Sequence, residues 1–357
     1  MSSIPMVYFR CFSRSTLLFS LFVSLSFSVL AQPPFRVMFY NVENYFDCKH
    51  DTLKLDTEFM PNSLRAWHYG RFKEKRNHIA QVITAIGGWQ APTLVGLCEV
   101  ENDYVMKQLV YYAGLKEQGY RYVMTHSSDR RGIDVALLWQ RDQFRYLAHD
   151  TLYIPLDALH HTPTRDILHV TGLLLTGDSL DVFVCHLPSR RGGAAASEPA
   201  RLKAASVLKQ YVDSLYSERT TPQIIIMGDF NDYPTNASLV QVLHATTPKS
   251  PIHATSLYNL MANKGEALGT HNYQGEWGVL DQLLVNGGLL QSSSAFSTND
   301  SLAHIGALPF LLTDDLKYGG TTTFRTYYGM RYQGGYSDHL PIWCDFRITI
   351  RDDKESY

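Results

Sequence analysis

The feature that most constrains this chain is a series of short apolar runs, each ended by a polar side chain. The runs are rich in β-branched and aromatic residues, and helical patterns lie between some of them, which predicts a mixed α/β fold. The expected strands are Phe35–Tyr40, Thr93–Cys98, Arg121–Thr125, Ile133–Trp139, Ile167–Leu175, Leu180–Cys185, Gln223–Met227, Val279–Val285 and Ile342–Ile350.

Two stretches carry helical spacing instead. The first repeats isoleucine and valine from Ile79 to Ile86 and stops at Gly87-Gly88. The second is expected to begin at Ser197-Glu198-Pro199, which has the composition of a helix cap, and to continue to Leu215. Each helix could cover one face of a sheet.

The N-terminus has the composition of a secretory leader. Arg10 and Arg14 precede an uncharged apolar stretch from Thr16 to Leu30, and Ala31 is a plausible cleavage point. A membrane anchor is the alternative, but the run is shorter than the roughly 20 apolar residues of a span, and serines interrupt it. We therefore expect residues 1–31 to be a signal peptide, residues 32–357 to form one domain, and the product to be periplasmic or extracellular.

Charge and cysteine content narrow the function classes. Loss of the leader removes two of the 32 basic side chains and none of the 34 acidic ones, so the net charge moves from −2 to −4. Proteins that bind duplex nucleic acid through many phosphates usually carry a basic excess, which this chain lacks. Cys98, Cys185 and Cys344 lie within apolar runs and are expected to be buried free thiols.

Polar residues of the kinds used in catalysis follow the strand-like runs. We expect the carboxyl ends of several strands to bring them to one place. The residues are Asn41, Glu99, His186, Asp229, Asn231, Asp281, Asp338 and His339.

Asp229 and Asn231 follow a buried run and suit phosphoester hydrolysis. A carboxylate can orient or deprotonate water, while an amide can donate to charge developing on phosphate. An Asx-rich turn is the alternative interpretation of this segment. Glu99 ends another strand and is a natural ligand for a hard cation such as Mg²⁺.

Asp338 and His339 are adjacent, so in extended chain they point in opposite directions and need different partners. Asp338 could complete the metal site, while His339 could bond Asp281 and thereby have its tautomer fixed. A structural histidine is the alternative for His339 taken alone.

His186 is followed by a cationic, glycine-containing loop. The guanidinium fork matches phosphate oxygens, so Arg190 or Arg191 beside a histidine suits a phosphate site. An ordinary basic surface loop remains the alternative for either arginine.

Taken together, these motifs resemble the endonuclease/exonuclease/phosphatase superfamily, which includes deoxyribonucleases, apurinic endonucleases, sphingomyelinases and inositol polyphosphate 5-phosphatases. The resemblance covers roughly residues 35–347. The motifs, in order, are Phe39-Tyr40-Asn41, Gly96-Leu97-Cys98-Glu99-Val100, Arg131-Gly132-Ile133-Asp134-Val135-Ala136, Val184-Cys185-His186, Gly228-Asp229-Phe230-Asn231, Leu280-Asp281 and Ser337-Asp338-His339.

The resemblance implies a four-layered α/β sandwich of two mixed sheets packed face to face and flanked by helices. It also implies roles for the site residues, including phosphate contacts from Arg131 and Arg165. By resemblance, Glu99, Asn41 and Asp338 hold Mg²⁺ or Mn²⁺, Asp229 positions or activates water, Asn231 and His186 contact the scissile phosphate, and Asp281 supports His339.

Three functions remain open at this point. The first is a secreted endonuclease acting on DNA or RNA, favoured by similarity of the loop after His186 to secreted bacterial nuclease-like members. The second is a phosphatase or phosphodiesterase acting on a small molecule or lipid, and the third is a catalytically inactive surface binding protein. We expect a monomer with no stable membrane insertion after cleavage.

Overall fold

A computed structural model describes residues 34–159 and 161–350. The predicted signal peptide lies outside these residues. Among the helices in these two ranges, none is both long and apolar enough to cross a membrane.

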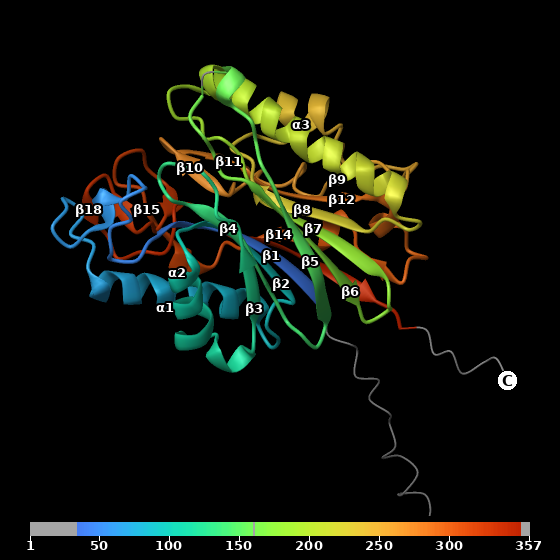
Figure 1. The fold of residues 1–357 in the computed structure, drawn as a ribbon, viewed down its shortest axis with the longest axis horizontal. Coiled ribbons are helices and arrows are strands. Elements are labelled where there is room, and N and C mark those ends of the chain that lie inside the picture. The colour runs from blue at the N-terminus through green and yellow to red at the C-terminus, as the bar shows by residue number, and fades with distance from the viewer. Residues whose placement is uncertain (1–33, 160, 351–357) are drawn as a thin grey trace, which may run out of the picture. The chain divides into compact units, whose positions relative to one another are not determined.

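Two large mixed sheets form the centre of the fold (Figure 1). The first has the order β13 (Phe296–Ser297), β19 (Ile342–Ile348), β1 (Phe35–Tyr45), β2 (Leu94–Val100), β4 (Asp134–Trp139) and β3 (Arg121–Met124), and β14 (Ala303–Ile305) also pairs with β19. The second has the order β5 (Phe144–Leu152), β6 (Ile167–Leu174), β7 (Ser179–His186), β8 (Ile224–Asp229), β12 (Asp281–Asn286) and β9 (Leu257–Asn259). The pairs β1–β2 and β7–β8 are parallel, whereas the other pairs are antiparallel.

Alternation along the strands explains why the sheets stack. Successive side chains of a strand point to opposite faces. Val37 and Phe39 of β1 lie in a core with Ile225 and Met227 of β8, between the two sheets. The intervening β1 residues belong to a second core and the intervening β8 residues to a third.

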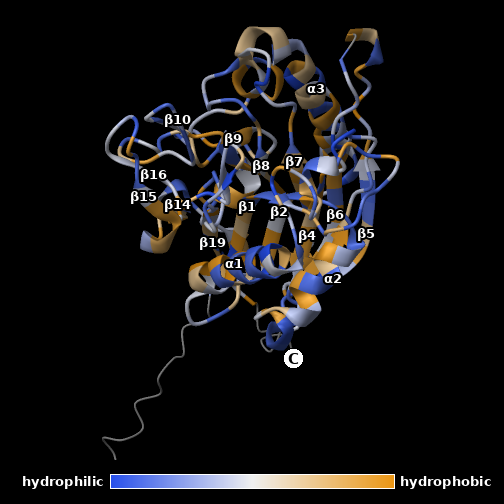
Figure 2. Cartoon of the chain, turned by 90° about the vertical axis from the view of Figure 1, so that its left-hand side faces the viewer, coloured by the Kyte–Doolittle hydropathy of each residue, from blue (hydrophilic) through white to orange (hydrophobic). Residues whose placement is uncertain are grey.

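Helices close these outer cores. α1 (Tyr69–Gly87) and α2 (Asp103–Tyr112) pack on the first sheet, and α3 (Ala194–Glu218) packs on the second. Figure 2 shows α1 and α2 over β1, β2 and β4, with α3 on the other side of the sheets. The result is helix, sheet, sheet, helix, so the predicted four-layered sandwich is confirmed.

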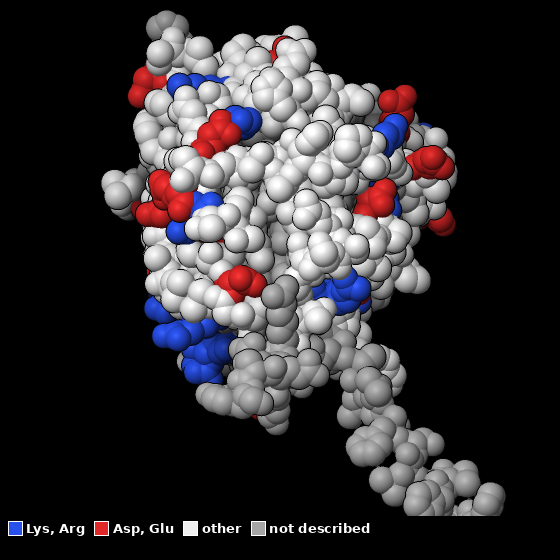
Figure 3. All heavy atoms as spheres, turned by 90° about the vertical axis from the view of Figure 1, so that its right-hand side faces the viewer, with Lys and Arg blue, Asp and Glu red and all other residues white. Residues whose placement is uncertain are grey.

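Three two-stranded hairpins extend from this framework. They are β10 (His271–Tyr273) with β11 (Glu276–Gly278), β15 (Leu312–Asp314) with β16 (Thr321–Thr323), and β17 (Tyr327–Tyr328) with β18 (Arg331–Tyr332). A single backbone bridge between His271 and His339 ties the first hairpin to the segment before β19. On the face in Figure 3, basic and acidic side chains are interspersed over a mostly uncharged surface.

Two sequence expectations need correction. α3 begins at Ala194 rather than Ser197, because Gly192 and Gly193, both with positive φ, make the entry turn. The Ser197 hydroxyl instead donates to the Gly193 carbonyl from inside the first turn. The strand β5 had not been expected, because it is an edge strand whose side chains are mostly exposed and show no apolar alternation.

Candidate active site

Strand register places three candidate residues on one line across the second sheet. His186 of β7 is paired with Asp229 of β8, and Asp229 is paired with Asp281 of β12. Each lies two residues beyond a side chain of the inter-sheet core in its own strand, so all three point toward the first sheet. The site therefore continues the apolar core at the edge where the strands end.

The backbones of β7 and β8 approach each other closely next to these residues. A Cβ on Gly228 would lie 2.3 Å from the Cys185 carbonyl oxygen, which only glycine avoids. The residues after these two positions are Asp229 and His186, whose side chains approach to 3.6 Å between the carboxylate Oδ2 and Nε2.

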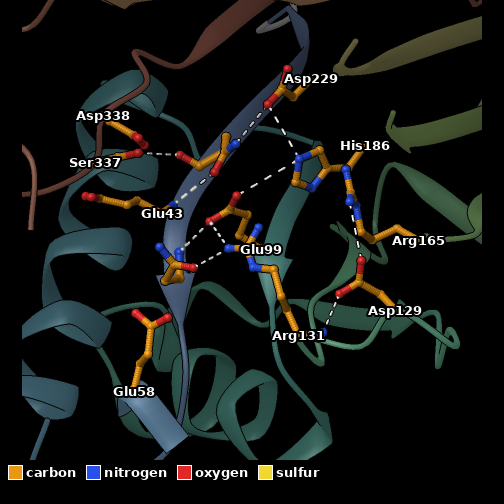
Figure 4. Close-up of polar contacts among 12 residues, drawn as sticks. Glu43, Glu58, Glu99, Asp129, Arg131, Arg165, His186, Asp229, Ser337 and Asp338 are labelled. Carbon is orange, nitrogen blue, oxygen red and sulfur yellow. Dashed lines mark hydrogen bonds and ion pairs between the residues drawn. The ribbon is translucent and has the colours of Figure 1, made fainter. Parts of the chain in front are cut away.

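The first sheet contributes Asn41 of β1, where the parallel pairing with β2 becomes irregular. Asn41 points to the second sheet, as Val37 and Phe39 do, and its Nδ2 donates to Asp229 Oδ2 at 3.1 Å. This hydrogen bond joins the two sheets within the site. Figure 4 shows His186 of the second sheet between Asp229 and Glu99, and Glu99 comes from the first sheet.

Glu99 reaches the site through a β-bulge. Cys98 pairs with Val135 and Val100 pairs with Asp134, so Glu99 is an extra residue between two pairs. Its φ of 63° turns the chain, and Glu99 Oε1 comes within 4.0 Å of His186 Nε2. Strict alternation would have turned Glu99 away from the inter-sheet core, so the bulge redirects its carboxylate.

Strained backbone is concentrated here. Glu43, Asn44, Glu99 and Asn231 all have φ between 50° and 63°, a region that L-residues other than glycine adopt at a cost. Asn231 compensates through its side chain, because Nδ2 donates to the Leu187 carbonyl at 3.1 Å. Such strain persists where the surrounding contacts impose it, which is typical of functional sites.

The histidine of the Ser337-Asp338-His339 motif forms the predicted contact with Asp281. His339 Nδ1 lies 2.8 Å from Asp281 Oδ2, and its Nε2 lies 3.7 Å from Asp229 Oδ2. Burial opposes the charged form, but the Asp281 and Asp229 carboxylates raise the pKa of His339 well above its ordinary value. These carboxylates therefore favour the charged form of His339.

His186 has the opposite character. Burial, with Arg165 and Arg131 nearby, lowers the pKa of His186 well below its ordinary value. The two histidines that flank Asp229 therefore have pKa values shifted in opposite directions. Burial raises the pKa of Asp229 to about 7, although the His339 charge opposes this shift.

Asp338 has a different hydrogen-bond partner from His339, as the alternation argument predicted. Its Oδ2 accepts a hydrogen bond from Arg325 Nη2 at 2.8 Å, and Arg325 also bonds the buried carboxylate of Glu43 at 3.1 Å. Although burial favours the neutral form, Arg325 lowers the pKa of Asp338 below its usual range. Asp338 is ionised and already has a cationic partner.

The oxygen donors at this edge fit a hard divalent cation. Glu99 Oε2 accepts from the Asn44 amide, whereas Oε1 accepts no hydrogen bond from the described residues. Among the described residues, two clusters of three side chains have possible metal-ligand atoms within 4.8 Å of one another. They are His271 with Asp338 and His339, and Asp229 with Asp281 and His339. Carboxylate oxygens are suitable ligands for Mg²⁺ or Mn²⁺. The ligand set of Asn41, Glu99 and Asp338 remains a prediction.

The four arginines assigned to phosphate have different surroundings. Arg131 Nη2 donates to Asn44 Oδ1 at 2.7 Å, and buried Arg165 donates to the Leu187 carbonyl at 2.6 Å, so both adjoin the site. Arg190 lies 4.5 Å over the Tyr233 ring and 3.9 Å from Asp232. Arg191 is exposed at the start of the turn before α3.

Sequence reasoning missed Glu43, Asn44, Lys75 and Arg325 around this site. The Lys75 amine is buried and donates to the Thr326 hydroxyl at 2.6 Å and to the Tyr336 carbonyl. Glu43 lies two residues beyond Asn41, so its position was a usable signal. Arg325 lies in a stretch without strand or helix pattern, which gave no indication of its partners.

These features define a phosphoesterase-type site at the edge of an α/β sandwich. The sequence profile of the Endonuclease/Exonuclease/phosphatase family matches residues 36–348, so the chain belongs to that family. It is a phosphoesterase hydrolase of a family whose members use divalent metals. A comparison with curated protein sequences gave no significant match.

Solved structures share the fold at low identity. A humanised D. rerio TDP2 has a TM-score of 0.54 and 13% identity, covering 87% of this chain and 98% of that one. The human Nocturnin catalytic domain has a TM-score of 0.53 and 17% identity, covering 90% and 95%. A Bacteroides thetaiotaomicron mannosyl-6-phosphatase has a TM-score of 0.54 and 14% identity, covering 87% and 98%.

Proposed function

We propose that the protein is a divalent-metal-dependent endonuclease that hydrolyses phosphodiesters of DNA or RNA. The observation that carries the proposal is the set of contacts around Asp229 Oδ2, where Asn41, His186 and His339 each place a nitrogen within 3.7 Å. Such a carboxylate can orient an attacking water while the histidinium stabilises charge on the phosphate.

Each residue then has one task. His339, held by Asp281, presents its Nε2 proton toward charge that develops on phosphate or on the leaving oxygen. Asn41 fixes the orientation of the Asp229 carboxylate across the two sheets. A cation bound by Glu99 and its neighbours would neutralise phosphate charge and lower the pKa of bound water.

A nucleic acid substrate is supported by two observations. Arg131 and Arg165 adjoin the site. A D. rerio TDP2 structure of the same fold, with a TM-score of 0.51 and 14% identity, contains a single-strand DNA product.

A phosphatase acting on a small phosphorylated molecule is the second candidate. It is favoured by the acidic net charge of the chain and by the fold shared with a mannosyl-6-phosphatase. A substrate panel separates the two. Residues 32–357 are assayed with plasmid DNA, RNA, sugar phosphates and lipid phosphates, with added Mg²⁺ or Mn²⁺, and with Asp229→Ala and His339→Ala as controls.

Metal-dependent nicking of plasmid or cleavage of RNA, lost in both variants, is the expected result. Hydrolysis confined to monoesters or lipids would transfer the site to the second candidate. Absence of turnover with every substrate and metal would instead favour an inactive binding protein.

The proposal includes export through cleavage after Ala31. Its basis is the apolar leader behind Arg10 and Arg14. Fractionation of cells expressing the full chain, with N-terminal sequencing, should find a product beginning at Gln32 outside the cytoplasm. A product that retains Met1 in the cytoplasm would contradict export.

A further inference from the structure

Arg325 connects two carboxylates beside the candidate active site. It lies between β16 and β17, in a stretch outside the motifs that predicted the site. Its Nη2 donates both to Glu43 Oε1 at 3.1 Å and to Asp338 Oδ2 at 2.8 Å. Its Nε also donates to Glu43 Oε1, at 3.2 Å. One guanidinium group therefore neutralises two carboxylates, as a bound cation would.

Both carboxylates lie on the same side of the site. Figure 4 shows Glu43 and Asp338 on one side of the view and His186 on the other. Glu43 follows Asn41 by two residues, and its backbone amide donates to Asn41 Oδ1 at 3.0 Å. Arg325 is therefore bonded to one candidate site residue, Asp338, and to the close neighbour of another.

The backbone around Arg325 is held against the chain that precedes Asp338. A Cβ on Gly335 would lie 2.4 Å from the Arg325 carbonyl oxygen, so only glycine permits this approach. The backbone amide of Thr326 donates to Glu43 Oε2 at 2.7 Å. These contacts fix the place of the guanidinium group independently of any ligand.

The charged group is largely withdrawn from solvent. The side chains of Glu43 and Asp338 are 4% and 20% exposed, and that of Arg325 is 36% exposed. Removing one partner from a buried ion pair leaves a charge without compensation, which costs more than an exposed pair contributes. An arginine also stays protonated over the whole pH range in which proteins are folded. Arg325 is therefore a permanent positive charge, whereas a metal ion can exchange with solvent.

A divalent cation would compete with this charge for Asp338. Carboxylate oxygens are the ligands that Mg²⁺ and Mn²⁺ prefer, but Arg325 already neutralises this carboxylate. The same charge opposes a cation in the cluster of His271, Asp338 and His339. Glu99 differs, because its closest contact with an arginine is 3.8 Å, which is longer than a hydrogen bond.

We propose that Arg325 is a built-in cation that takes the place of a metal ion between Glu43 and Asp338. The wild-type protein then holds one divalent cation, at Glu99, and Asp338 is not among its ligands. Arg325 supplies positive charge to the site without binding or releasing an ion. The inference rests on the proposed metal-dependent function and departs from the ligand set that the family resemblance implies.

Titration of metal-free residues 32–357 with Mn²⁺ tests this proposal without any substrate. Calorimetry measures the affinity, and electron paramagnetic resonance of the free ion measures the number of ions bound. The wild type should bind one Mn²⁺. Asp338→Asn should leave the affinity nearly unchanged, because Arg325 already neutralises that carboxylate, whereas Glu99→Gln should weaken it at least about tenfold.

Loss of the guanidinium should create a second ion site. Arg325→Gln leaves Glu43 and Asp338 without their shared cation, so this variant should bind two Mn²⁺. Adding Asp338→Asn to it should restore one, and Arg325→Lys should also bind one because lysine keeps the charge. Arg331→Gln is the matched control, since Arg331 is an exposed arginine of β18 whose guanidinium makes no hydrogen bond or ion pair with the described residues.

Equal weakening of Mn²⁺ binding by Asp338→Asn and Glu99→Gln would make Asp338 a ligand and overturn the proposal. So would a single ion in Arg325→Gln, or two ions or none in the wild type. If melting shows that Arg325→Gln does not fold, the comparison of Asp338→Asn with Glu99→Gln still decides.

Failure of this inference and failure of the proposed function are distinguishable, because the titrations need no turnover. A protein that is inert with every substrate but shows the expected Mn²⁺ pattern would retain the inference and lose the proposed function. An active enzyme in which Asp338→Asn and Glu99→Gln weaken Mn²⁺ binding equally would do the reverse.

Discussion

At the scale of single residues, the charge of the active site depends on a pair of side chains. His339 is held 2.8 Å from Asp281, and this carboxylate is the first of the charges that raise the pKa of the histidine. Asp281 is fully buried. Asp281 is thus a positioning residue that acts through His339.

A double-mutant cycle tests this relation. His339→Gln should lower kcat by about 10²–10⁴, the usual contribution of a positioned acid or base. Asp281→Asn should lower kcat less, and should add little in the His339→Gln background because the two groups act as a unit. If the loss of kcat in the double variant equals the product of the two single losses, the pairing is contradicted. Thermal melting of all four proteins controls for folding.

Substitutions of Asn231 can separate the cost of its backbone conformation from the catalytic role of its side-chain amide. At its φ of 50°, alanine is strained whereas glycine is not, and neither carries the amide. Asn231→Gly should therefore be more stable than Asn231→Ala by about 1 kcal/mol, while both lose the same large fraction of activity. Urea unfolding and kcat measure the two effects. Equal stability would argue against strain, and an active glycine variant would argue against a role for the amide.

These candidate residues could be predicted from sequence because they lie at the ends of apolar strands. Asp229, His186 and Asp281 need only correct strand pairing to meet. Glu99 needs a bulge and a positive φ to reach them, and no local pattern signals either. Glu43 and Arg325 are 282 residues apart in the sequence, so no local sequence pattern predicts their contact.

At the scale of elements, a buried carboxylate ties three of them together. Asp181 of β7 accepts from Thr171 of β6 at 2.6 Å, lies 3.0 Å from His169 of β6, and pairs with Arg219, which ends α3, at 3.0 Å. Although burial opposes the charged form, these partners together lower the pKa of Asp181 to about 2. This group anchors the end of the helix layer that lies away from the active site.

The lowered pKa has a defined effect on acid stability. The unfolded chain binds the proton near the ordinary pKa of 3.8 and the folded chain only near 2, so the stabilisation is complete above pH 4 and is lost as pH falls to 2. Asp181→Asn should lower the free energy of unfolding by about 2 kcal/mol at pH 7. The stability of this variant should also depend less on pH in this window. Exposed Asp213, also on the α3 side, is the control, since Asp213→Asn should leave both nearly unchanged. Parallel stability curves for Asp181→Asn and wild type would contradict this account.

Element boundaries followed from sequence where burial imposed a pattern. The buried strands β7 and β8 agree with their apolar runs to within two residues because both faces are covered. β1 starts where its run starts, at Phe35, but continues five residues beyond the expected end at Tyr40. The edge strand β5 was missed, since an exposed strand needs no apolar alternation. The sequence pattern predicts the start of α3 one turn too late, because Gly192 and Gly193 make the entry turn and Ser197 lies inside the helix.

At the scale of the whole molecule, three stacked cores explain why a catalytic edge exists. The sheets face each other through apolar side chains, and this apolar packing gives way to polar groups where β1, β2, β7 and β8 end. Asn41 and Glu99 come from one sheet and His186, Asp229 and Asp281 from the other. Any change that separates the sheets should therefore disrupt the site before it unfolds the helices.

The most direct test of this account is the metal dependence of phosphodiester hydrolysis. Turnover of bis(4-nitrophenyl) phosphate by residues 32–357 is measured against added Mg²⁺ or Mn²⁺, after treatment with EDTA, for the wild type and Glu99→Gln. The account predicts no turnover in EDTA, full recovery on adding metal, and a metal requirement at least about tenfold higher in Glu99→Gln. Equal turnover with and without EDTA, or a Glu99→Gln variant with an unchanged metal requirement, would contradict it.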